Sequence, residues 1–287
     1  LAAINLVTPM QNIITNFGSG ITVAGAVLIA QYIGAGEKED ARSMANQIFA
    51  CAMGFAVVCA TLCFLGTPAI VNWLGADGGT AYYARVYLRV VIWDMPFLYM
   101  VNIFSAVHQA QGDTVRPMFL NLGGITLNLF LDPFFMIILN LGTAGAALAT
   151  LLAKAIPAIV AFGLLCRQEN DICLNRKYMR LQKEKLGMIL KIGLPTAIGG
   201  STMQLGFLLM SKNVFVYGTE AMAAYGIGNK VNGLITLPSN AIGSATATIV
   251  GQNMGAKQSD RAEKGYRFSM WISVVFLFIG GMILSRD

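Results

Sequence analysis

Charged side chains are scarce in this sequence. Asp, Glu, Lys and Arg make up only 12% of its 287 residues, while hydrophobic residues make up 56%. Soluble domains carry about 25% charged residues. A helix crosses the hydrocarbon core of a bilayer with roughly 20 apolar residues, and such stretches recur along the whole chain. The composition therefore excludes a soluble globular domain and predicts an all-α polytopic membrane protein.

Residues of the usual catalytic and metal sites are scarce as well. The chain has one histidine, His108, and five cysteines without paired metal-ligand spacing. This argues against His-based catalysis and against Cys/His metal centres. The sequence also has no glycine-rich phosphate-binding loop. We therefore predict a protein that is not an enzyme and needs no cofactor, and we expect His108 to be a satisfied interface residue.

The basic residues are distributed unevenly between the two sides of the expected membrane. Eight apolar stretches are long enough to span it: 1–33, 46–73, 88–108, 118–139, 143–166, 188–217, 221–250 and 268–285. If the first span runs inward, 14 of the 20 Lys and Arg residues fall on the inner side: Lys38, Arg42, Arg116, Arg167, Arg176, Lys177, Arg180, Lys183, Lys185, Lys191, Lys257, Arg261, Lys264 and Arg267. This is the positive-inside pattern of membrane proteins. It accounts for the net charge of +6 without a nucleic-acid partner.

A repeat relates the first span to the seventh. Residues 2–41 match residues 223–262 at eleven positions, and both copies end in Gln-x-x-Gly-Ala, at Gln31–Ala35 and Gln252–Ala256. The copies are six spans apart, so they cross the membrane in the same direction. A parallel repeat of this kind is an architecture of secondary transporters.

The repeat predicts two six-helix lobes, with this chain truncated at both ends. The second copy follows a full span at 188–217, whose counterpart would precede Leu1. We therefore expect a fragment holding the second to the ninth of twelve spans. Its parts would be an amino-terminal lobe lacking its first helix (1–166), a charged cytoplasmic linker (167–187) and the first three helices of a carboxy-terminal lobe (188–287).

Asp132 is the most unusual residue of the spans, because it lies in the apolar stretch LNLFLDPFF (127–135). A carboxylate inside a membrane span indicates a functional site. Asn128 precedes it by four residues and so shares its helix face. Pro133 deprives the Leu129 carbonyl of its usual partner and favours a kink. Together these oxygens suit Na⁺ or a proton-binding carboxylate.

Two further residues of the next span relate to this site. Thr150 lies among small residues in GTAGAALAT, which allow its helix to approach closely. Lys154 follows one turn later, and it either pairs with Asp132 as a counter-ion or extends to the inner interface. Asp94, the other carboxylate within the spans, precedes a proline near the outer end of its span, so we expect it to cap a helix.

Short motifs mark the helix boundaries. HQAQGDTVRPM (108–118) predicts an inner turn, in which Gly112 ends one helix, Asp113 or Thr114 caps the next and Pro117 lies in its first turn. GLP at Gly193–Pro195 is expected to start the sixth span. Together with the LDP motif, GAALAT and the paired Gln-x-x-Gly-Ala ends, these motifs resemble the multidrug and toxic compound extrusion (MATE) family.

The resemblance covers essentially the whole chain. It implies a secondary antiporter that exports cationic or amphipathic drugs and toxins in exchange for H⁺ or Na⁺ by alternating access. The family's cation site is matched here by Asn128, Asp132 and Thr150, and its first-helix Asp falls before Leu1. Lys154 lies outside the family pattern.

The resemblance also implies partners and a location. We expect a monomer in the lipid bilayer of the bacterial plasma (inner) membrane, with small-molecule substrates and H⁺ or Na⁺ as the coupling ion. The candidate substrate-cavity residues are Gln31, Met203, Gln204 and Asn232.

The alternative functions are a flippase and a channel or receptor. A lipid-linked oligosaccharide flippase of the same superfamily would carry a cationic central cavity, whereas the two spans expected to line that cavity hold only Lys230 as a charge. A channel or a receptor that does not transport is the other alternative. The parallel repeat and the carboxylate within a span favour the transporter.

Overall fold

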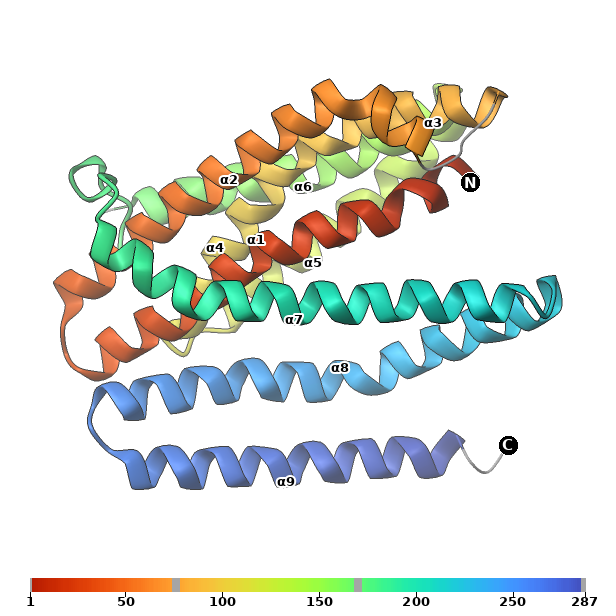
Figure 1. Ribbon diagram of the computed structural model, residues 1–287. Helices are drawn as coiled ribbons and strands as arrows, with labels where there is room; N and C mark the ends of the chain where they lie inside the picture. The colour runs from red at the N-terminus through yellow and green to blue at the C-terminus, as the bar shows by residue number, and fades with distance from the viewer. Residues whose placement is uncertain (1, 74–77, 168–171, 285–287) are drawn as a thin grey trace.

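The computed structural model describes residues 2–73, 78–167 and 172–284, and it is built from long helices joined by short connections (Figure 1). The elements are α1 (Ala2–Gly34), α2 (Lys38–Trp73), α3 (Gly78–Val91), the 3₁₀ turn η1 (Ile92–Asp94), α4 (Met95–Ala110), α5 (Val115–Pro133), the π-helical turn η2 (Phe134–Ile138), α6 (Gly142–Cys166), the 3₁₀ turn η3 (Arg176–Tyr178), α7 (Lys183–Phe215), α8 (Thr219–Gly255) and α9 (Ser259–Leu284). The all-α prediction is confirmed. The outermost residues of the first and last predicted spans lie outside the described residues.

Within the described residues, 6 helical stretches are long and apolar enough to cross a membrane. They are Ile14–Gly34, Lys38–Asn72, Ala84–Ala110, Val115–Ile138, Ala144–Cys166 and Ser259–Met282. Helices α7 and α8, with 33 and 37 residues, are long enough to cross a membrane but are not among these six stretches. They nevertheless lie alongside α1 and α9 in the same layer of long helices (Figure 1).

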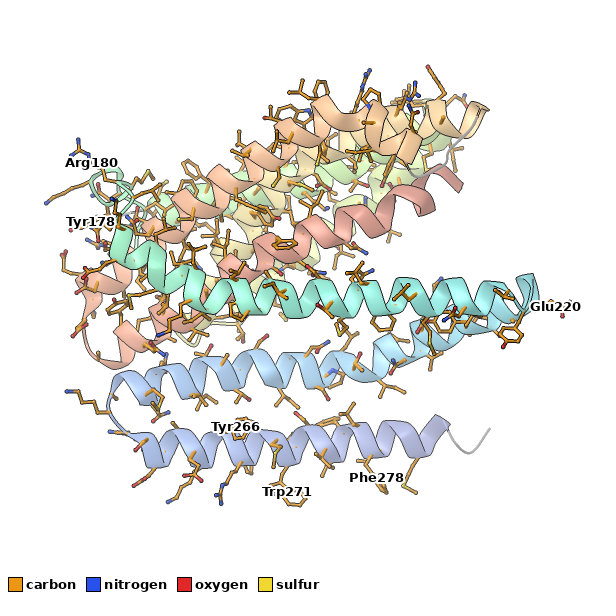
Figure 2. All side chains as sticks on the ribbon, in the orientation of Figure 1. Tyr178, Arg180, Glu220, Tyr266, Trp271 and Phe278 are labelled. Carbon is orange, nitrogen blue, oxygen red and sulfur yellow. The ribbon has the colours of Figure 1, made fainter. Side chains whose placement is uncertain are left out.

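Four connections gather at one end of the bundle, which we call the basic end. They join α1 to α2, α4 to α5, α6 to α7 and α8 to α9, and they lie at the left in Figure 1. Arg180, one of the basic residues predicted for the inner side, lies at this end and is labelled with Tyr178 in Figure 2. Glu220 lies at the opposite end. Helices α1 and α8 run in the same direction (Figure 1), as the repeat predicted.

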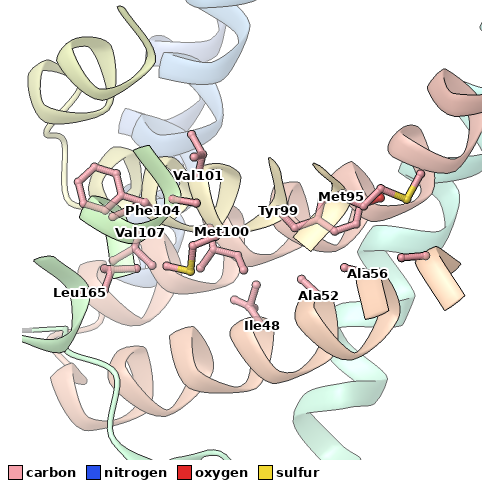
Figure 3. Close-up of a cluster of buried hydrophobic side chains, with 14 of the residues drawn as sticks. Ile48, Ala52, Ala56, Met95, Tyr99, Met100, Val101, Phe104, Val107 and Leu165 are labelled. Carbon is pink, nitrogen blue, oxygen red and sulfur yellow. The ribbon is translucent and has the colours of Figure 1, made fainter. Parts of the chain in front are cut away.

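The buried core belongs almost entirely to α1–α6. Ile48 of α2, Tyr99 and Phe104 of α4 and Leu165 of α6 are fully enclosed, and Figure 3 shows them in one cluster of buried hydrophobic side chains. By contrast, the described hydrophobic residues that are buried in α7–α9 are Ile189, Ala197 and Ala262. Apolar side chains such as Trp271 and Phe278 project from α9 (Figure 2). Exposed apolar surface of this kind suits a membrane protein, because lipid tails are as apolar as the side chains.

Helices α1 and α7 cross at a pair of glycines. A Cβ atom on Gly20 would overlap the Gly193 carbonyl, and one on Gly193 would press on the Gly20 carbonyl. Small residues allow helix backbones to approach this closely. The GLP motif therefore lies inside α7, which begins at Lys183. The prediction that GLP starts this helix is wrong, because α7 already begins at Lys183 and the glycine of the motif lies at the crossing with α1.

The two Gln-x-x-Gly-Ala motifs contact each other at the basic end. A Cβ atom on Gly34 would overlap the main-chain carbonyl of Gln252, and one on Gly255 would overlap the carbonyl of Gln31. The contact is reciprocal: each glycine lies against the glutamine of the other copy. The Gln252 side chain also donates a hydrogen bond to the Ala110 carbonyl of α4 (2.7 Å). This contact closes the basic end between α1 and α8.

The linker before α7 is fixed to the start of α2 by two buried amides. The Asn46 side chain donates to the Cys173 carbonyl (3.2 Å) and accepts from the Asn175 N–H (2.8 Å). The Gln47 side chain donates to the Tyr178 and Arg180 carbonyls at 2.8 and 2.6 Å. The predicted linker is therefore docked over its described part, and its residues 168–171 lie outside the described residues.

An ion pair and a hydrogen bond extend this docked linker. Lys185 pairs with Asp40 at 2.9 Å. The Tyr178 hydroxyl donates to the Glu39 carboxylate at 2.7 Å, and this hydrogen bond raises the pKa of the hydroxyl. The two contacts join the linker and the first turn of α7 to the first turn of α2. They hold the basic end of α7 against the first six helices.

The predicted turn between α4 and α5 is confirmed. Gly112 adopts a positive φ of 85° after α4 ends at Ala110. The Asp113 carboxylate accepts hydrogen bonds from the N–H groups of Val115 and Arg116 at 3.0 and 3.2 Å. Pro117 lies in the first turn of α5. The turn sets where α5 begins and therefore the height of Asp132 in the bundle.

Candidate functional site

The candidate site is centred on the last turns of α5. Asn128 and Asp132 are half-buried and share a helix face, and the Asn128 amide lies 3.5 Å from a carboxylate oxygen of Asp132, a long hydrogen bond. Pro133 follows, and the helix then widens into the π-helical turn η2. Proline has no N–H to donate to the Leu129 carbonyl, and π-helical turns within helices are frequent at functional sites. The irregularity predicted at Pro133 is thus observed as a π-helical turn, in which the helix is locally wider.

A cavity of about 270 Å³ lies beside this face, between α4, α5 and α6. Asn128, Thr150 and Lys154 contribute to its lining, while Leu98, Val101 and Pro157 supply apolar walls. The structure therefore brings three of the four residues predicted for the site to one cavity. Asp132 reaches the same region through its contact with Asn128.

The hydroxyl oxygen of Thr150 is available to accept a hydrogen bond or to bind a cation. Its hydroxyl donates to the Ala146 carbonyl, one turn back in α6, at 2.9 Å. Since the single proton of the hydroxyl is engaged within the helix, the oxygen presents its lone pairs to other groups. Oxygens of a hydroxyl, an amide and a carboxylate are ligands suited to hard cations.

Lys154 pairs with Asp94. Its ammonium contacts the Asp94 carboxylate, which is fully buried, while the Lys154 side chain remains 30% exposed. The sequence predicted that Lys154 would contact Asp132 or the inner interface, and neither is the contact observed. Asp94 occupies the residue before α4, yet its side chain makes no capping hydrogen bond. The capping prediction is therefore wrong: the carboxylate is held by the lysine instead.

Lys154 links the ion pair to the candidate site. It contacts the Asp94 carboxylate and lines the same cavity as Asn128 and Thr150. Asp94 lies in η1, the short break between α3 and α4, and Asp132 lies at the end of α5. The ion pair and the candidate site are therefore neighbouring parts of one polar region inside the first six helices.

The site residues suit a monovalent cation or a proton. Within the described residues, no group of three or more His, Cys, Asp and Glu side chains is placed to hold a metal ion. The donor set of Asn128, Asp132 and Thr150 is composed of oxygens, the kind of group that coordinates Na⁺ in transporters.

The remaining candidates lie elsewhere. Gln31 belongs to the contact between α1 and α8 at the basic end. Met203 and Asn232 are exposed and Gln204 is half-buried, and none of the four lines the cavity described above. Their assignment to a substrate cavity stays a prediction.

His108 has the satisfied structural role that was expected. It is buried, its Nδ1 lies 2.9 Å from the Phe104 carbonyl, and its ring packs against the Phe104 ring with centroids 4.0 Å apart. Both residues lie on α4, so the packing is within that helix. The five cysteines are free.

The fold defines a class: the molecule is an all-helical polytopic membrane protein with a polar site inside its first six helices. Comparison with family models identifies the family. The MatE model matches residues 1–134 and 195–285. The chain belongs to this family, which confirms the resemblance read from its motifs.

The curated relatives include bacterial multidrug resistance and export proteins. The "Probable multidrug resistance protein YoeA" of Bacillus subtilis is 24% identical over 99% of this chain and 62% of its own length. The "Probable multidrug resistance protein NorM" of Thermotoga maritima is 29% identical, covering 92% of this chain and 57% of that protein. The chain thus spans about 60% of the length of these relatives.

Solved structures share the fold. A MATE crystal structure in complex with MaL6 superposes with a TM-score of 0.92 at 24% identity, over 96% of this chain and 62% of that one. The outward-facing conformation of a multidrug resistance MATE family transporter superposes with a TM-score of 0.89 at 24% identity, with the same coverage. The helical arrangement described above is therefore the arrangement found in MATE structures.

Proposed function

We propose that this protein acts, as part of a complete transporter, as a secondary antiporter that exports cationic or amphipathic compounds in exchange for H⁺ or Na⁺. The observation that carries the proposal is Asp132, a half-buried carboxylate at a widened helix turn, with Asn128 and Thr150 nearby. A carboxylate inside a membrane span is costly unless a cation, a proton or a polar partner neutralises it. That cost is what allows a mobile cation to bind there and favour one conformation over another.

The contact between α1 and α8 supports alternating access. The two copies of the repeat close the basic end through Gly34 and Gly255, where no side chain intervenes. In secondary transporters, related halves rock against each other around a central site. We propose that this contact forms when the transporter opens to the outside and separates when it opens to the inside.

The proposed partners follow from the same evidence. The relatives' names refer to multidrug resistance and export, which supports small drug-like substrates. The basic end, with Arg180 and Lys185, supports an inner-side orientation in a bacterial plasma membrane. We propose two six-helix lobes for the complete protein, and the parallel direction of α1 and α8 supports this arrangement.

Replacement of Asp132 tests the proposal. In cells that depend on the full-length protein for resistance to a cationic dye, Asp132→Asn should abolish resistance while the protein stays in the membrane at normal abundance. The amide keeps the shape but cannot neutralise a cation. Glu263→Gln is the matched control, because this carboxylate pairs with Arg267 at the exposed basic end. Full resistance with Asp132→Asn would refute the coupling role.

A further inference from the structure

Lys154 is a built-in cation beside the candidate site. It lies one helical turn after Thr150 on α6, and residues at this spacing have Cβ atoms about 5–6 Å apart. It also lines the same cavity as Thr150 and Asn128. Among the residues that line this cavity, Lys154 is the charged one. A cation that enters the cavity therefore meets a positive charge already in place.

Asp94 keeps this positive charge at the site. The carboxylate is fully buried and contacts the Lys154 ammonium, so the lysine is held by an ion pair that bridges η1 and α6. Removing one partner of such a pair leaves an uncompensated buried charge, which is strongly unfavourable. The lysine is thus anchored within the helices, although its side chain is long enough to reach an interface elsewhere.

We infer that Lys154 excludes Na⁺ from the site formed by Asn128, Asp132 and Thr150. The inference rests on the proposed function and specifies its coupling ion further. A sodium ion needs several oxygen ligands at once, and it would have to gather them in a cavity where Asp94 holds the Lys154 ammonium in place. The fixed positive charge repels a second cation that enters this cavity. A proton binds to a single carboxylate oxygen, so it does not need the set of ligands that a sodium ion needs.

The charged surroundings support the inference. The charged groups beside the cavity are Lys154 of α6 and its partner Asp94 of η1. Asp94 is engaged by Lys154, so the ion pair leaves Asp132 with its amide neighbour Asn128. The Asp94–Lys154 pair has no net charge, but Lys154 is the partner that lines the cavity.

Sodium binding to the purified full-length protein tests this role. Radioactive Na⁺ is titrated at constant pH into the wild type, Lys154→Arg and the double variant Asp94→Asn/Lys154→Met. The double variant removes both buried charges together, so it leaves no unpaired charge to unfold the protein, and it also removes Asp94 as an alternative sodium ligand. We expect it to bind Na⁺ about tenfold or more tightly than the wild type, because a repelling charge one turn away is removed. Lys154→Arg should behave like the wild type.

A triple variant assigns the new sodium site. Adding Asp132→Asn to the double variant should abolish the gained binding, since the carboxylate that attracts Na⁺ is lost. The inference is overturned if the wild type binds Na⁺ as tightly as the double variant, or if a folded double variant does not gain binding. Export of a cationic dye is measured separately. If the wild type fails to export dye under any ion gradient, the proposed function fails, while the sodium titration still reports on Lys154.

Discussion

The surroundings of two carboxylates, Asp94 and Asp132, differ. Asp94 is fully buried and contacts the ammonium of Lys154. Asp132 is only half-buried, and its described side-chain hydrogen bond is a long one to Asn128 at 3.5 Å. Asp94 lies in the break between α3 and α4, close to the buried core, whereas Asp132 lies on α5, where Pro117 is the buried residue among those described.

The difference indicates which carboxylate is better suited to bind a cation reversibly. A carboxylate with a permanent counter-ion has its charge compensated inside the protein, and exchanging that partner would disturb the fold. A carboxylate whose described partner is an amide can still be stabilised by a cation that binds reversibly. The ion pair fixes the position of Asp94, and we propose Asp132 as the exchangeable site, although both are acidic residues followed closely by proline.

The largest expected effect on stability comes from breaking the fixed pair. Asp94→Asn should lower the free energy of unfolding by about 3 kcal/mol, because Lys154 then loses its partner within the helices. Asp132→Asn should change it by less than about 1 kcal/mol, because only a long hydrogen bond is affected. Thermal unfolding of the purified full-length variants in detergent measures both.

The control for this comparison is the neutral double variant. Asp94→Asn/Lys154→Met should recover most of the stability lost in Asp94→Asn, since no buried charge is left alone. Equal losses for Asp94→Asn and Asp132→Asn would contradict the distinction between a fixed and an exchangeable carboxylate.

A smaller effect is expected at the amide beside Asp132. Asn128→Ala removes one oxygen ligand and one neighbour of the carboxylate, so it should weaken binding of the coupling ion by about 1 kcal/mol, or roughly fivefold. The concentration of coupling ion that gives half-maximal dye export reports this change.

Asn121→Ala is the matched control for Asn128→Ala. Asn121 lies on the same helix, but its side chain donates to the Pro117 carbonyl at 2.9 Å. Its replacement should leave the half-maximal ion concentration unchanged. If both alanine variants shift it equally, the effect belongs to α5 in general and Asn128 has no special relation to Asp132.

Local patterns in the sequence predicted much of this structure. The spacing of Asn128 and Asp132, and the turn around Gly112 and Asp113, follow from helix periodicity and from capping preferences, which act over a few residues. These predictions are confirmed in the geometry. The repeat likewise indicated that α1 and α8 are related and run in the same direction.

Contacts between distant segments could not be predicted from the sequence. Lys154 and Asp94 are 60 positions apart, and nothing in either local pattern shows that α6 brings them together. The local signal before a proline even favoured a cap for Asp94, and the ion pair prevailed. The docking of the linker on Asn46 and Gln47 was missed for the same reason, since amides within an α-helix carry no sign of their partners.

The central claim is that Asp132 couples an ion to export, and ion-driven flux tests it most directly. Full-length wild type and Asp132→Asn are reconstituted in liposomes, and uptake of a cationic dye is recorded after a pH or a sodium gradient is imposed. We predict gradient-driven dye movement with the wild type and none with Asp132→Asn, although both proteins insert in equal amounts. Gradient-driven movement at the same rate with Asp132→Asn would contradict the account.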